Sequence, residues 1–205
     1  MYLYDVKIDL TGHVMTIFLI LAPFATFAAL MLVAPAAVGL LAGAAIAAAT
    51  IAYDLYNGRS LKMLAAGAAI MFGTLGGWIA LIDGSWTATE VRLAVDLGTL
   101  AIALFSIAIR SPFTLQYARE TVDAAIQQTS GFRRANYILT LAWTGAFSLM
   151  LIANLLTVYL PGLPFWVGLA VGFAARNGAL VFTKWYPQYR RAKYPLPPAS
   201  TMPAI

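Results

Sequence analysis

Six stretches of the chain are each long and apolar enough to cross a lipid bilayer as a helix. The hydrocarbon core is about 30 Å thick, so a spanning helix needs about 20 mainly apolar residues. Within that core the backbone polar groups are satisfied inside a helix. The stretches cover about residues 14–34, 36–56, 62–82, 91–109, 135–159 and 163–184. The sequence therefore predicts an all-α polytopic membrane protein, a compact bundle of six transmembrane helices forming one domain over residues 1–194.

Composition excludes the main alternatives to a membrane protein. Of the 205 residues, 61% are hydrophobic and 10% are charged, whereas a soluble domain carries about 25% charged residues. The same apolar content argues against intrinsic disorder. The chain contains no cysteine, which excludes disulfides, thiolate metal sites and cysteine nucleophiles within it.

The boundary between the first two stretches rests on Pro35. Proline lacks a backbone donor and disfavours a helical residue before it. A single helix over residues 14–56 would be about 60 Å long at 1.5 Å per residue, too long for one crossing. The sequence therefore predicts a helical hairpin with its turn at residues 34–36, and a kink at Pro23 within the first helix.

Basic residues fix the expected orientation. Arg92 falls on one side of the six predicted spans, and Arg176 falls inside the last span. The other eleven all fall on the opposite side: Lys7, Arg59, Lys62, Arg110, Arg119, Arg133, Arg134, Lys184, Arg190, Arg191 and Lys193. Because positive residues mark the cytoplasmic face, both termini are expected in the cytoplasm.

The one long loop, residues 110–134, is expected to carry an amphipathic helix over about 112–129 that lies on the cytoplasmic surface. Ser111 is the expected N-cap, Pro112 the first helical residue, and Gly131 the end. Apolar residues recur there at helical spacing: Leu115, Ala118, Val122, Ala125 and Ile126. After residue 194 the chain is rich in proline, and residues 195–205 are expected to form a flexible tail.

Three pairs of glycines have the Gly-x-x-x-Gly spacing that lets membrane helices approach closely. They are Gly39 with Gly43, Gly73 with Gly77, and Gly168 with Gly172. Packing within the bundle is the favoured interpretation. Contact with other membrane proteins, or with a second copy of the chain, is the alternative.

Arg176 is the main candidate for a functional side chain, because an arginine at mid-helix costs roughly 2.5–3.5 kcal/mol on insertion. Asp54 and Asp96 are its candidate ionic partners, and Asn154 and Asn177 are candidate neutral partners. The site is interpreted as a lock between helices, as a binding site for an anionic solute or substrate, or as part of a gate. Asp96 and Asn154 lie at similar predicted depth. They are expected to bond across their helices or to line a water-filled vestibule.

No catalytic, metal-binding or cofactor-binding constellation is evident in the sequence. His13 is the only histidine, and one imidazole does not make a metal site. A further set of basic residues is expected to contact anionic lipid headgroups, at about 1 kcal/mol each. These are Arg133, Arg134, Arg190, Arg191 and Lys193. Nucleic acid is not an expected partner, because the topology already explains the basic clusters.

Several short motifs occur in a recognisable order between about residues 55 and 160. They are Asn57-Gly58-Arg59, Arg110-Ser111-Pro112-Phe113, Gln116-Tyr117-Ala118-Arg119-Glu120, Phe132-Arg133-Arg134-Ala135-Asn136, Thr140-Leu141-Ala142-Trp143 and Asn154. This order resembles the bacterial intracellular septation protein A-like proteins and related six-helix inner-membrane families. The resemblance implies a non-enzymatic protein of the bacterial inner membrane, connected with the integrity of the cell envelope.

Two main hypotheses for the function follow. The first is an integral inner-membrane scaffold or accessory protein that acts through helix–helix and headgroup contacts. The alternative is a small transporter or channel that binds an anionic solute at Arg176. An intramembrane enzyme is a third and less favoured reading.

Overall fold

The computed structural model describes residues 10–122, 124–160 and 162–193, with side chains for all of them except residues 10–19, 165 and 191. Over this part of the chain the secondary structure is helical, without strands. The elements are α1 (Leu10–Leu30), α2 (Ala36–Tyr56), α3 (Met63–Leu81), α4 (Ala88–Ala108), α5 (Phe113–Ala118), the 3-10 turn η1 (Arg119–Thr121), α6 (Ala124–Gln127), α7 (Ser130–Tyr159) and α8 (Phe165–Lys193).

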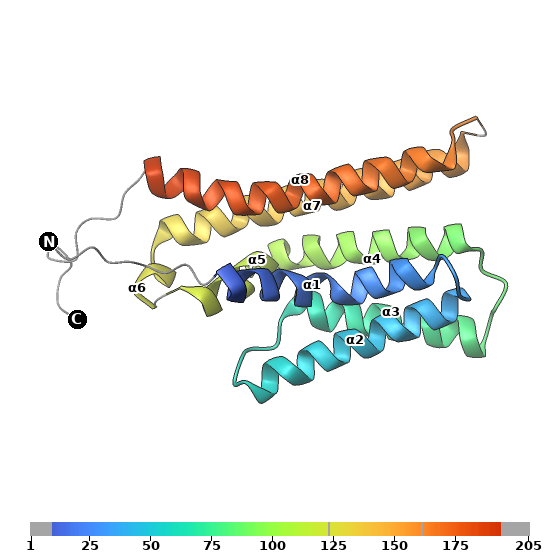
Figure 1. Cartoon of the computed structure of the whole chain (residues 1–205), viewed down its shortest axis with the longest axis horizontal. Helices are drawn as coiled ribbons and strands as arrows, with labels where there is room; N and C mark the ends of the chain where they lie inside the picture. Colours follow the sequence, from blue (N-terminus) through green and yellow to red (C-terminus); the bar gives the residue numbers. More distant parts are fainter. Residues whose placement is uncertain (1–9, 123, 161, 194–205) are drawn as a thin grey trace, which may run out of the picture.

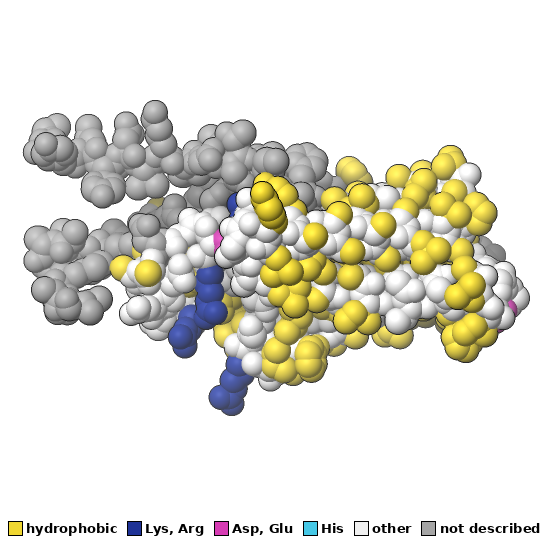
Figure 2. Space-filling view, turned by 90° about the horizontal axis from the view of Figure 1, so that it is seen from below, with side chains coloured by type: hydrophobic (Ala, Val, Ile, Leu, Met, Phe, Trp, Pro, Cys, Tyr) yellow, Lys and Arg dark blue, Asp and Glu magenta, His cyan; other side chains and the backbone are white. Residues whose placement is uncertain are grey.

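Five of the long helices have the length and apolarity needed to cross a membrane, namely α2, α3, α4, α7 and α8. The prediction of these five spans is therefore confirmed in length and composition. In α1 the stretch with described side chains is shorter, Ile20–Leu30, so its role as a span stays a prediction. The surface also suits a lipid environment. Large apolar side chains such as Phe173 (73% exposed) and Ile70 (67% exposed) point outward, and Figure 2 shows hydrophobic side chains along the helices.

The long helices pack mainly in chain order. α1 packs on α2, α2 on α3 and α3 on α4, while α7 packs on both α4 and α8. Figure 1 shows the result: α1–α4 form one group, α7 and α8 form an adjoining pair, and α5 and α6 lie at one end of the bundle. We call this end the α5 end. At this end lie the last residues of α2, α4 and α8 and the first residues of α3 and α7.

Glycine allows the first three helices to approach closely around a buried aromatic cluster. Phe72 of α3 is fully buried, and its ring centroid lies 5.3 Å from those of Phe24 and Phe27 in α1. A Cβ atom at Gly43 would lie 3.1 Å from the Phe72 ring and 3.2 Å from the Pro23 carbonyl oxygen. A side chain at position 43 would therefore push α1, α2 and α3 apart.

The other glycine pairs behave differently from one another. A Cβ at Gly168 would lie 3.0 Å from Asn154 Oδ1, so α8 approaches α7 closely there. Close packing within the bundle is thus confirmed at Gly43 and Gly168. The prediction of close packing is wrong for Gly77, where an added Cβ would meet nothing within 4 Å. The neighbouring Gly76 lies at the close contact instead, because a Cβ added there would be 3.0 Å from the Leu41 side chain.

Several helices extend beyond the apolar stretches from which they were predicted. α4 begins at Ala88 rather than near 91, because Thr87 and Glu90 form a reciprocal capping box. α7 begins at Ser130 rather than near 135, because the Thr129 hydroxyl caps it, and Gly131 lies in its first turn instead of ending a preceding helix. α8 continues to Lys193, well past the predicted end near 184. Hydropathy reports where the apolar core ends and carries no information on where the helix ends.

The single surface helix expected over residues 112–129 is wrong. The segment forms α5, η1 and α6, with Val122 in an extended conformation (φ −135°, ψ 153°) that interrupts the helix. The Gln127 amide stabilises the break by donating to the carbonyl oxygens of Arg119 (2.8 Å) and Val122 (2.9 Å). Two polar bonds across the break therefore replace the regular helix bonds that the amphipathic pattern led us to expect.

α5 is also buried rather than lying on the surface. Phe113 and Leu115 are each 4% exposed, and Phe113 joins a core cluster with Trp143 of α7. The chain enters α5 through Arg110, whose φ of 57° is left-handed and turns the backbone sharply at the end of α4. Ser111 is not the N-cap: Pro112 holds that position, and the Phe113 N–H donates to the hydroxyl of Ser106, 3.3 Å away.

Candidate functional site

Among the described residues, the most concentrated group of charges lies at the α5 end and is centred on a buried lysine. Lys62, just before α3, has a side chain that is 2% exposed. Its Nζ lies 2.6 Å from Oδ2 of Asp54 in α2 and 3.0 Å from Oε2 of Glu120 in η1. Arg59 adds a guanidinium 3.5 Å from Oδ1 of Asp54 and 4.0 Å from Glu120 Oε2. We call these four residues the ionic cluster; its two cations and two anions neutralise each other.

The turn between α2 and α3 brings Asp54 and Lys62 together. Gly58 has a φ of +69°, a left-handed conformation that glycine adopts without a steric penalty. The Arg59 N–H then donates to the Asp54 carbonyl oxygen at 2.9 Å. The Ser60 N–H and hydroxyl both donate to Oε1 of Glu120, each at 3.3 Å. One oxygen of Glu120 therefore holds the turn while the other binds the lysine.

Gln116 in α5 binds the beginning of α3 and the connection between α4 and α5. Its Oε1 accepts the Met63 N–H at 2.7 Å, which satisfies a free donor in the first turn of α3. Its Nε2 donates to the carbonyl oxygen and the hydroxyl of Ser111, at 3.3 and 3.2 Å. Together with Glu120, this glutamine ties the end of α2 and the beginning of α3 to the segment that carries α5.

The aromatic ring of Tyr117 in α5 also lies close to Lys62. The Lys62 Nζ lies 5.4 Å from the centre of its ring, close enough for a cation–π attraction. Burial, followed by the nearby negative charges of Asp54 and Glu120, raises the pKa of the Tyr117 phenol above its ordinary value. The phenol is therefore held in its neutral form.

Sequence reasoning found only one member of the ionic cluster. Asp54 was a candidate partner of Arg176, and that pairing is wrong because Asp54 binds Lys62 and Arg59 instead. Lys62 was interpreted as a marker of the cytoplasmic side, and Arg59 as such a marker and as part of a short motif; neither was predicted to form an ion pair. The separation of eight residues between Asp54 and Lys62, across an Asn-Gly turn, was a usable signal. Glu120 was noted only as part of a short motif, and nothing in the sequence pointed to its contact with Lys62, which lies far along the chain.

A second polar group lies toward the opposite end of the bundle. Asn154 of α7 donates from Nδ2 to Oδ2 of Asp96 in α4, at 2.5 Å, so the predicted bond between these helices is confirmed. The partly buried Arg176 of α8 and Arg92 of α4 interact electrostatically with the Asp96 carboxyl group. Asn177 does not belong to this group: it is exposed, and its amide donates to the Phe173 carbonyl oxygen in its own helix.

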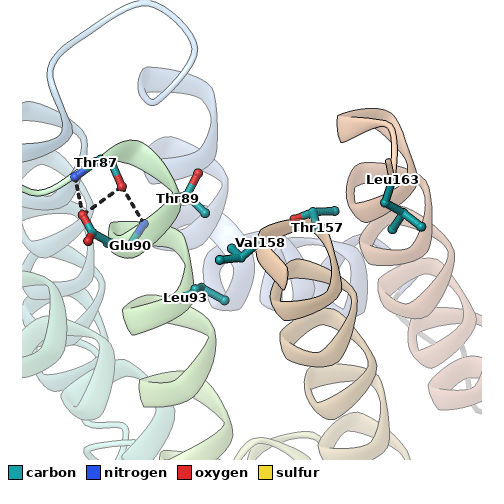
Figure 3. Close-up of a pocket in the computed structure, with 7 residues that line it drawn as sticks. All are labelled: Thr87, Thr89, Glu90, Leu93, Thr157, Val158 and Leu163. Atoms are coloured by element: carbon teal, nitrogen blue, oxygen red, sulfur yellow. Dashed lines mark hydrogen bonds between the residues drawn. The ribbon is translucent and has the colours of Figure 1, made fainter. Parts of the chain in front are cut away.

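A pocket of about 400 Å³ opens one helical turn beyond the Asp96–Asn154 bond (Figure 3). It lies between the beginning of α4 and the end of α7, and its lining residues are Thr87, Thr89, Glu90, Leu93, Thr157, Val158 and Leu163. Glu90 is held in the capping box, where its Oε2 accepts from the Thr87 N–H at 2.7 Å and from the Thr87 hydroxyl at 2.8 Å. Neither Asp96 nor Asn154 lines this pocket, so it is not the vestibule expected around those two residues.

A basic pocket of about 320 Å³ lies between α7 and α8 at the α5 end. Its lining residues are Arg134, Ile138, Tyr186, Tyr189, Arg190 and Lys193. Three of the five predicted headgroup contacts thus come together here. Arg133 is exposed and does not line the pocket, and the side chain of Arg191 lies outside the described part of the chain.

The remaining predicted features give no site within the described residues. The side chain of His13 and the tail 195–205 lie outside them. Where side chains are described, no group of three or more His, Cys, Asp and Glu is arranged to hold a metal ion.

Comparison with protein-family models, with curated proteins and with solved structures gives no match for this chain. The geometry described above therefore carries the argument for function.

Proposed function

We propose that the chain is an integral protein of the bacterial cytoplasmic membrane that crosses it six times, with the α5 end and both termini in the cytoplasm. α1 has 21 residues, which at 1.5 Å per residue gives about 31 Å, enough to cross the hydrocarbon core. The distribution of charge supports the orientation. On the face of the molecule that Figure 2 shows, the Lys and Arg side chains gather at the α5 end. The positive-inside rule expects this for the cytoplasmic side.

We further propose that the protein is a non-enzymatic scaffold or accessory protein. The observation that carries this proposal is the ionic cluster. Its four charged side chains bind one another and, with Gln116, fasten the end of α2 and the beginning of α3 to the segment that carries α5 and η1. Charges arranged in this way hold a bundle in one shape. The exposed apolar faces of the helices then supply the surface for lipids and for neighbouring membrane proteins.

The resemblance to the intracellular septation protein A-like proteins gives the proposed role its biological setting. It rests on the order of short basic and aromatic motifs between about residues 55 and 160. Within this proposal, the scaffold contributes to the integrity of the cell envelope or to a larger membrane complex.

The alternative, transport of an anionic solute at Arg176, has weaker support from the geometry. The guanidinium of Arg176 interacts with the carboxyl group of Asp96, and Glu90 lines the pocket that opens at that end. An anion entering there would meet the carboxyl group of Glu90, and it would compete with the carboxyl group of Asp96 for the arginine. The arrangement fits an electrostatic tie between α4 and α8 better than an anion-binding site.

Reconstitution into liposomes tests this choice. We expect that chloride and phosphate efflux from liposomes containing the full chain will equal efflux from empty liposomes. We also expect the variant Arg176→Gln to restore any envelope defect of cells that lack the protein. Anion efflux that the wild type supports, that Arg176→Gln abolishes and that the matched variant Arg92→Gln preserves would replace the scaffold with a transporter.

A further inference from the structure

We infer that the basic pocket between α7 and α8 binds the phosphodiester headgroup of one anionic phospholipid of the cytoplasmic leaflet. This inference rests on the proposed orientation of the protein in the membrane and deepens the scaffold function by naming a lipid that the scaffold holds. It concerns a single built pocket, as opposed to a general attraction between basic residues and a negatively charged surface.

The lining of the pocket matches a phosphodiester. Arg134, Arg190 and Lys193 supply three cations, and Tyr186 and Tyr189 supply two phenol groups; among the described residues that line the pocket there is no carboxylate. Guanidinium groups form paired, charge-assisted hydrogen bonds with phosphate oxygens. A volume of about 320 Å³ is adequate for a phosphate with a small alcohol such as glycerol.

The two helices hold these side chains in place. A Cβ at Gly131, in the first turn of α7, would lie 3.4 Å from Nη2 of Arg190, so this arginine of α8 reaches across to the beginning of α7. Lys193 Nζ donates to the Tyr189 hydroxyl at 3.1 Å, and the Tyr189 ring stacks on Trp185 at 5.1 Å. The cations therefore converge through contacts between and within the helices.

The position of the pocket points to a lipid rather than to a free anion. It lies at the end of the candidate span Trp166–Arg190, where the exposed ring of Trp185 is typical of the membrane interface. Ile138 gives the pocket an apolar wall. Leu141, one turn further along α7, is 55% exposed. An acyl chain attached to a bound headgroup would lie against this apolar surface.

The test compares two double variants that remove the same charge. Arg134→Gln with Lys193→Gln removes two cations of the pocket. Arg133→Gln with Lys184→Gln removes two exposed cations from the same two helices, outside the pocket. The full chain is purified in a neutral detergent, and binding of phosphatidylglycerol and of phosphatidylcholine with identical acyl chains is measured by native mass spectrometry. Inorganic phosphate and glycerol phosphate are added in separate arms as free anions.

We expect the wild type to bind one phosphatidylglycerol in preference to phosphatidylcholine. The pocket variant should bind it about 25-fold more weakly, since each interfacial cation contributes about a fivefold effect, while the control variant should bind it like the wild type. The inference would be overturned if the wild type bound both lipids equally, or if both variants lost the same amount of phosphatidylglycerol binding. It would also be overturned if free phosphate displaced the lipid at equal concentration. Binding in detergent does not depend on orientation, so a failed topology experiment and a failed lipid experiment are distinguishable.

Discussion

Replacement of Lys62 by methionine is the most informative test of how the bundle is held together. The substitution keeps the approximate length of the side chain and removes its charge from a position that is 2% exposed. The carboxylate of Asp54, 8% exposed, would then keep only Arg59 as an ionic partner, at 3.5 Å and 40% exposed. Glu120 would keep the same arginine at 4.0 Å.

The expected cost follows from this loss of a buried partner. Removing one member of a buried ion pair costs about 3–5 kcal/mol, and we expect about 3 kcal/mol because Arg59 still compensates part of the charge. Adding Asp54→Asn to Lys62→Met should recover more than about 1 kcal/mol, since it removes the carboxylate left without its lysine.

The free energy of unfolding is measured by titrating the protein in mixed micelles with a denaturing detergent and following the loss of helix. Lys184→Met, an exposed lysine on α8, is the matched control and should change the free energy by less than about 0.5 kcal/mol. The reasoning is refuted if Lys62→Met is as stable as this control, or if Asp54→Asn adds its full cost to that of Lys62→Met.

Three further predictions use the same unfolding measurement. Asn154→Leu removes the amide that binds the α4 carboxyl group and should cost about 1 kcal/mol; equal stability of Asn154→Leu and of the exposed control Asn177→Leu would contradict the role of that bond. Gly43→Ala places a Cβ 3.1 Å from an aromatic ring and should cost about 1–2 kcal/mol, whereas Gly77→Ala, with open space around it, should be neutral or stabilising; similar effects at both positions would contradict the packing argument. The raised pKa of Tyr117 means that the folded state keeps a proton that the unfolded chain loses above about pH 10, so stability should fall as the pH rises through that region; a fall of the same size in Tyr117→Phe would show that another group is responsible.

Local features of the sequence were sufficient for the long helices and for one bond between them. Apolar content is a local property, so five spans could be read from it directly. The Asp96–Asn154 bond could be found because both residues lie a similar distance from the ends of their predicted helices. Asp54 and Asp96 were both candidate partners of Arg176; in the structure Asp54 binds Lys62 and Arg59, and Arg176 interacts with Asp96.

The structure at the α5 end could not be predicted, because it depends on contacts between distant parts of the chain. The pattern of apolar residues around Leu115 is compatible with a surface helix, yet burial of Phe113 against α7 draws this segment into the bundle. Glu120 then meets Lys62, and the helix breaks at Val122. A charge that pairs across 58 residues of sequence leaves no local signal, so the lysine was read as an ordinary loop charge.

The orientation of the six helices is tested most directly by labelling single cysteines, which the absence of natural cysteine makes simple. Val33→Cys and Gly84→Cys lie in exposed turns at the end opposite α5, while Gln128→Cys and Ala192→Cys are exposed at the α5 end. A cysteine added before Met1 reports whether α1 crosses the membrane.

In intact spheroplasts, a membrane-impermeant maleimide should label the cysteines at positions 33 and 84. It should label those at positions 128 and 192, and the one before Met1, only after the membrane is permeabilised. Labelling of the N-terminal cysteine from outside would leave five spans. Labelling of positions 128 and 192 from outside would reverse the orientation and contradict the central claim.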